Sequence, residues 1–96
     1  MIDKNLRGIA KISDNEKEFL LEYYVVKSKK TNIYTLEIDK SLKNSLGELN
    51  VCEKYVSTYG SYNCKEMNDV ADLLIKNSVT PITADSILQD IKYSKK

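Results

Sequence analysis

The sequence predicts an α+β fold, in which an antiparallel sheet of three to four strands is followed by two C-terminal helices packed on one face. The stretch up to residue 58 contains short apolar runs separated by polar turns, which is the pattern of β-strands. The last third repeats apolar residues at three- and four-residue steps, the pattern of amphipathic helices. Residues 1–96 are assigned to a single domain, because the chain contains no linker and no internal repeat.

Strands are expected at about residues 6–12, 17–27, 33–39 and 48–58. The first contains Gly8 and Ala10, which indicate close packing or an edge position, and residues 1–5 are predicted to be loose. The second is apolar on both faces, a pattern typical of a central strand or of one covered on both sides. Its faces consist of Phe19, Leu21, Tyr23 and Val25 on one side and Leu20, Tyr24 and Val26 on the other.

The third strand alternates Tyr34, Leu36 and Ile38 with polar residues, so it is half-buried and forms a hairpin with the second. Residues 40–46 fit either one helical turn or a loop. Residues 48–58 are interpreted as a strand because of their β-branched and aromatic side chains, although their apolar residues also fit a helical step.

Two helices are expected at about residues 63–77 and 81–93. Asn63 is a good N-cap residue with Glu66 at the capping-box spacing, and Pro81 suits the first turn of the second helix. The apolar stripes of both helices need cover from the hairpin. The predicted core therefore consists of Leu74, Ile87, Leu88 and Ile91 packed against Phe19, Leu21, Tyr34, Leu36 and Ile38.

Two stretches of the chain resemble small clostridial proteins grouped as a domain of unknown function. They are the strand Ile33-Tyr34-Thr35-Leu36-Glu37-Ile38 and the segment from Leu74 to Asp90. The likeness spans the chain from about Tyr24 onward, and its most specific piece is Val79-Thr80-Pro81-Ile82. The resemblance implies a bacterial housekeeping or regulatory module, and it brings no activity, cofactor or site residue to this chain.

The charge balance argues against nucleic-acid binding. The sequence contains 15 basic and 14 acidic residues, so the net charge is +1, and Arg7 is the single arginine. A basic patch is the usual electrostatic footprint of a nucleic-acid-binding domain. The C-terminal helix pair does suggest a helix-turn-helix, and a nucleic-acid-associated regulator is the alternative function. Asp85 and Asp90 on the second helix would repel phosphates, so we predict no nucleic-acid partner.

Residues that carry most catalytic and metal chemistry are scarce. The sequence has no histidine, the commonest general base and metal ligand. Cys52 and Cys64 are too few for a disulfide framework and are not spaced as zinc ligands, so we expect reduced, buried side chains. Glu16, Glu18 and Glu22 alternate along one strand and are interpreted as a solvated acidic face. We therefore predict no enzyme, no catalytic residue, no metal site and no cofactor.

The expected location is the cytoplasm, with no membrane partner. The most apolar run, residues 19–26, is far shorter than a membrane span and contains Glu22. The N-terminus is polar and does not have the pattern of a signal peptide.

A cluster of tyrosines provides the candidate interaction surface: Tyr55, Tyr59 and Tyr62. Tyrosine offers a large contact area with a polar tip, and the open edges of a small sheet favour strand addition. The alternative is a purely structural role, in which these rings pack against the sheet and cover the start of the helix. We predict a small protein-interaction or regulatory module that binds another protein or forms a homodimer. A small-molecule binder or an enzyme would require a deep pocket.

Overall fold

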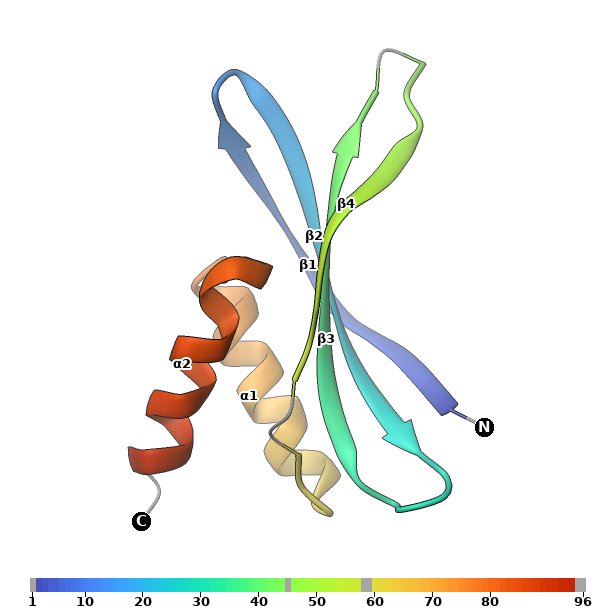
Figure 1. The fold of residues 1–96 in the computed structure, drawn as a ribbon, viewed down its shortest axis with the longest axis vertical. Helices are drawn as coiled ribbons and strands as arrows, with labels where there is room; N and C mark the ends of the chain where they lie inside the picture. Colours follow the sequence, from blue (N-terminus) through green and yellow to red (C-terminus); the bar gives the residue numbers. More distant parts are fainter. Residues whose placement is uncertain (1, 45, 58–59, 95–96) are drawn as a thin grey trace.

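The computed structural model describes residues 2–44, 46–57 and 60–94, which form a four-stranded antiparallel sheet followed by two helices (Figure 1). The strands pair in chain order, β1-β2-β3-β4. Their bounds are β1 Ile2–Asp14, β2 Lys17–Ser28, β3 Tyr34–Lys43 and β4 Leu49–Val56, and the helices are α1 Cys64–Lys76 and α2 Pro81–Ser94. The predicted fold class is confirmed, and the ambiguous stretch at residues 48–58 contains a strand.

The strands run further than the sequence indicated. β1 begins at Ile2, because β2 extends to Ser28 and pairs with it over its full length; the prediction that residues 2–5 are loose is wrong. β3 continues to Lys43, so the first half of the ambiguous stretch 40–46 is strand. The turn after it is closed by Asn44, whose Oδ1 accepts hydrogen bonds from the N–H groups of Leu46 and Glu48 at 2.9 Å each.

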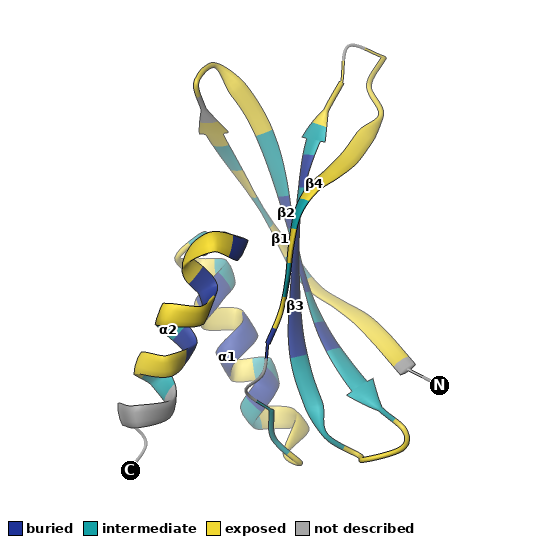
Figure 2. Ribbon diagram, in the orientation of Figure 1, coloured by how far each residue is buried: buried dark blue, intermediate teal, exposed yellow. Residues whose placement is uncertain are grey.

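Both helices lie on the same side of the sheet (Figures 1 and 2). α1 contacts β1, β2 and β3, whereas α2 contacts β3 and β4. No described segment covers the opposite side. The core fills the space between the two layers and consists of Leu21, Tyr23, Val25, Leu36, Ile38, Met67, Val70, Ala71, Leu74, Val79, Ala84 and Leu88.

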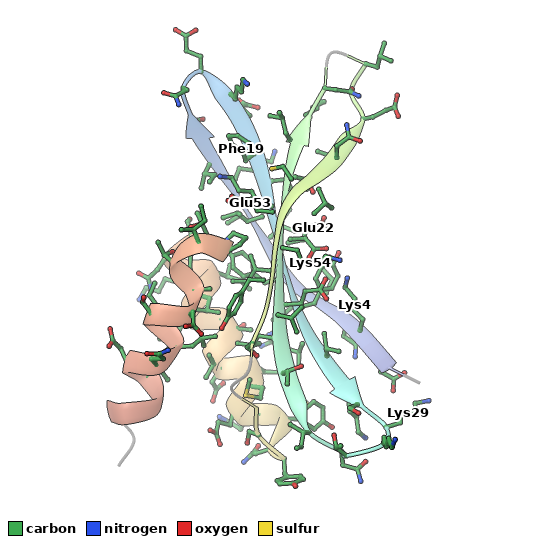
Figure 3. The ribbon with its side chains drawn as sticks, in the orientation of Figure 1. Lys4, Phe19, Glu22, Lys29, Glu53 and Lys54 are labelled. Carbon is green, nitrogen blue, oxygen red and sulfur yellow. The ribbon has the colours of Figure 1, made fainter. Side chains whose placement is uncertain are left out.

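The predicted core is confirmed except at Phe19. Leu21, Leu36, Ile38, Leu74 and Leu88 are buried, and Tyr34, Ile87 and Ile91 pack against them while half-buried. Phe19 is half-buried outside this cluster, because the β1–β2 hairpin extends past the helices and carries its ring beyond their cover (Figure 3). The ring instead lies under the Lys40 ammonium, 4.3 Å from its centroid.

Local contacts hold the helix layer against the sheet. Asn63 caps α1 as expected, with its side chain accepting a hydrogen bond from the Glu66 N–H at 3.2 Å. At the corner between the helices, the buried Tyr23 hydroxyl donates to the Val79 carbonyl at 2.8 Å. A methyl group at Gly8 would lie 2.7 Å from Ile75 Cδ1, so the side chains of α1 pack closely over this glycine. Gly8 also lies on the edge strand β1, so both expectations for it, close packing and an edge position, are confirmed.

Candidate interaction surface

The strand register defines which side chains share the side of the sheet away from the helices. Residues directly opposite each other in an antiparallel pair point to the same side. Glu22 lies opposite Ile9 on β1 and Asp39 on β3, and Asp39 lies opposite Lys54 on β4. We call this side the helix-free face. It comprises Lys4, Leu6, Ile9, Lys11, Leu20, Glu22, Tyr24, Val26, Thr35, Glu37, Asp39, Ser41, Val51, Lys54 and Val56.

Three carboxylates occupy the middle of the helix-free face: Glu22, Glu37 and Asp39, which we call the acidic centre. Figure 3 shows Lys4, Glu22 and Lys54 on the side of the sheet away from the helices. Lys4 Nζ lies 2.5 Å from Glu37 Oε2 and 3.7 Å from Asp39 Oδ2. Lys54 Nζ lies 3.8 Å from Glu37 Oε2. The two lysines are therefore the cations of this cluster.

The aromatic ring of Tyr24 joins the cluster from β2. Its hydroxyl donates to Glu22 Oε2 at 3.2 Å, and the Lys4 ammonium lies 4.2 Å from its centroid. These side chains cover the carboxylates of β3, so Glu37 and Asp39 are only 9% and 5% exposed although α1 and α2 both lie on the other side of the sheet (Figure 1). Burial of two adjacent carboxylates makes their ionisation interdependent.

The pKa values of Glu37 and Asp39 shift in opposite directions. Burial raises the pKa of Asp39, and the neighbouring Glu37 carboxylate raises it further. Burial also acts to raise the pKa of Glu37. The hydrogen bond from Lys4, the hydrogen bond shared with the Asp39 carboxyl and the charges of Lys4 and Lys54 outweigh it, so this pKa lies below its ordinary value. Asp39 Oδ1 is buried and accepts no hydrogen bond from the residues that the structure describes. Buried acceptors normally have a hydrogen-bond donor, so an oxygen without one is unusual.

Apolar side chains flank the acidic centre on both outer strands. Leu6 and Ile9 on β1 and Val51 and Val56 on β4 are each about half exposed. Below the acidic centre, toward the β2–β3 turn, the face is hollowed to a volume of about 700 Å³. The hollow is lined by Lys4, Val26, Ser28, Thr31, Ile33, Thr35, Glu37, Val56 and Gly60. Apolar patches around a polar centre are a common composition of binding surfaces.

The structure separates the tyrosines of the predicted surface. Tyr55 is on the helix side, opposite Ile38, where its hydroxyl donates to Asp85 Oδ1 of α2 at 3.1 Å. Burial, together with this bond, raises the pKa of Tyr55 to about 12. Tyr62 is 74% exposed and follows Ser61, which pairs with Tyr34. Tyr55 therefore lies beside Ile38, and Tyr62 lies next to the partner of Tyr34. Because Tyr34 and Ile38 are about 13 Å apart along β3, the two tyrosines do not form one cluster.

Tyr59 lies outside the described residues. Of the other two, Tyr55 is occupied in joining the sheet to α2, while Tyr62 is free to contact a partner. The role of the tyrosines in binding stays a prediction.

Sequence reasoning missed the acidic centre. The sequence predicts a solvated acidic face for Glu22, and Glu37 and Asp39 are among the polar residues that alternate along the predicted half-buried strand. The available signal was a pair of carboxylates two residues apart on β3, but only the register places Lys4, 33 residues away, on top of them.

The expectation of buried cysteines is wrong, since Cys52 and Cys64 are both free and exposed. Cys52 lies at a bulge, where β4 places an extra residue between the partners of Lys40 and Ser41.

Within residues 2–44, 46–57 and 60–94, no three His, Cys, Asp or Glu side chains are grouped to hold a metal ion. In the same part of the chain, no helix is long and apolar enough to cross a membrane.

These features define a two-layer α+β protein with one face of its sheet open. The chain belongs to DUF6514, a family of unknown function, whose family model matches residues 4–93. The resemblance to a family of unknown function is thereby confirmed. No curated protein and no solved structure matches the chain.

Proposed function

We propose that this protein is a small bacterial cytoplasmic module that binds another protein through its helix-free face. The observation that carries the proposal is the placement of four half-exposed apolar residues on either side of a charged centre: Leu6 and Ile9 on β1, and Val51 and Val56 on β4. Such side chains gain free energy when a partner removes them from water. Exposed free thiols fit a reducing compartment, which supports the cytoplasmic part of the proposal.

The open face is a better candidate for this binding than the edge strand β1. β1 carries Lys4, Arg7 and Lys11, and its register shifts next to Arg7. The Arg7 guanidinium is also held by two hydrogen bonds to Asp72 of α1, at 2.7 and 2.8 Å. Charges and bulges on edge strands are the usual means of preventing strand addition. The proposal therefore concerns binding through side chains, without catalysis or a cofactor.

Site-specific photocross-linking in cells that make the protein tests the proposal. A photoreactive residue would replace Val56 on the face. As the control it would replace Ile82, which is 74% exposed on α2, and α2 lies on the other side of the sheet (Figure 1). We expect a discrete cross-linked species from position 56 and none from position 82. The companion variant Ile9→Ser, on the same face, should abolish that species.

The results distinguish three cases. Equal cross-linking from positions 56 and 82, or none from position 56, would refute the proposed surface. A cross-link between two copies of this chain would show that the partner is a second copy and that the protein forms a homodimer.

A further inference from the structure

The acidic centre contains more carboxylates than ammonium groups. Its three carboxylates face the two ammonium groups of Lys4 and Lys54, and Asp39 Oδ1 has no hydrogen-bond donor among the described residues. Lys54 is the looser cover: its side chain is 52% exposed, and its ammonium reaches Glu37 only at 3.8 Å. A partner that displaces Lys54 and brings a donor of its own would satisfy the buried oxygen.

A second copy of this chain does not meet that need. In a two-fold dimer the same patch meets itself. A two-fold axis through the middle of the helix-free face would stack one acidic centre on the other. Like charges brought together at an interface oppose binding, so the charge pattern favours a different protein with a positive centre.

The dimensions of the face suit one helix. The distance from β1 to β4 is three strand spacings, about 14 Å, and a helix with its side chains is about 10–12 Å wide. A helix lying along β2 and β3 would contact Leu6 and Ile9 on one side and Val51 and Val56 on the other. The side chain at its middle would point at the acidic centre.

We infer that the occupant of the helix-free face is an amphipathic helix of another protein, with an arginine or lysine at the centre of its apolar stripe. The inference rests on the proposed function and names the chemistry of the partner. The helix would form a third layer on the sheet, opposite α1 and α2. The basic side chain would pair with Glu22 and Asp39, while the apolar stripe covers the outer strands.

A displayed library of helical peptides tests this chemistry on the full chain. Peptides of about 18 residues match the roughly 27 Å from Glu18 to Val26 on β2. They would carry an apolar stripe with the middle position randomised. We expect arginine or lysine to be enriched at that position, and its replacement by glutamate to weaken binding about tenfold or more.

Matched variants locate the binding. Asp39→Asn should reduce the affinity for the enriched peptides about tenfold while the chain stays folded, because the substitution removes a charge without changing the shape of the side chain. Asp90→Asn, which removes the same charge from the exposed side of α2, should leave the affinity unchanged. Enrichment without a basic residue, no enrichment at all, or equal binding to the wild type and Asp39→Asn would overturn the inference.

Repeating the photocross-linking from position 56 in the Asp39→Asn background separates this inference from the proposed function. Loss of a cross-link that the wild type forms supports both. A cross-link that persists at full yield overturns the basic helix and leaves the binding face intact. Failure of the wild type to cross-link refutes the proposed function, and it refutes the inference as well.

Discussion

Replacing Leu88 with alanine tests how α2 is held to the sheet. Leu88 is 2% exposed and belongs to the core cluster. Truncation removes three buried carbons, which costs about 2.4 kcal/mol in transfer free energy. The cavity left behind adds to that loss, so we expect the free energy of unfolding to fall by about 2–5 kcal/mol. For a domain of this size the melting temperature should fall by about 10–30 °C.

Urea unfolding followed by circular dichroism measures the change, with Ile82→Ala as the control on the same helix. Ile82 is 74% exposed, so its truncation should change the free energy of unfolding by no more than about 0.5 kcal/mol. If Leu88→Ala unfolded at the urea concentration of the wild type, or if both variants were equally destabilised, the assignment of Leu88 to the buried side of α2 and of Ile82 to its exposed side would be wrong.

Four further predictions concern the sheet, its charges and nucleic-acid binding. Tyr23→Phe should lower the free energy of unfolding by about 1–3 kcal/mol, because the Val79 carbonyl loses its buried donor; an unchanged urea midpoint would contradict this. Asp39→Asn should stabilise the protein at neutral pH, because the pKa of Asp39 is raised on folding and its ionised form opposes folding above that pKa. The extra stability of the variant should disappear as the pH falls to the ordinary pKa of 3.8, where the wild-type carboxyl is protonated. Glu37→Gln should do the opposite, since the lowered pKa of Glu37 contributes stability above its ordinary value of 4.5 that is lost as the pH falls through the folded-state pKa; urea midpoints measured across this pH range check both signs. A titration with mixed DNA duplexes at physiological salt should show nothing tighter than the non-specific range of about 10⁻⁴ to 10⁻⁶ M, and a tight, sequence-dependent complex would revive the helix-turn-helix alternative.

The opposite effects of Asp39→Asn on stability and on binding have a common cause. A carboxylate held in a buried, incompletely paired site weakens the folded chain, and a partner that supplies the missing positive charge recovers that free energy on binding. A variant that melts at a higher temperature and binds less well is therefore the expected signature of a binding role. A structural role for Asp39 would instead make the variant less stable.

The sequence by itself determined the elements and most of the core. Alternation along residues 33–39 and the stripes of Leu74 and Leu88 are local patterns, as are the Asn63 cap and the Pro81 start. Each depends on residues within one or two turns or on one strand, so the sequence alone carries them. The tyrosine cluster is the interaction surface that the sequence predicts for the same reason, because a sequence pattern relates only residues that are near one another in the chain.

The tertiary structure decided the rest. The extent of β1 depends on the length of β2, and the exposure of Phe19 depends on where the helices end relative to the hairpin. The acidic centre exists because antiparallel pairing places Lys4 and Lys54 beside the carboxylates of β3. A shift of one residue in that register would turn Glu37 and Asp39 toward the helices, since side chains alternate between the faces of a strand. The open face and its charges are therefore products of register and layer order, which no single stretch of the chain encodes.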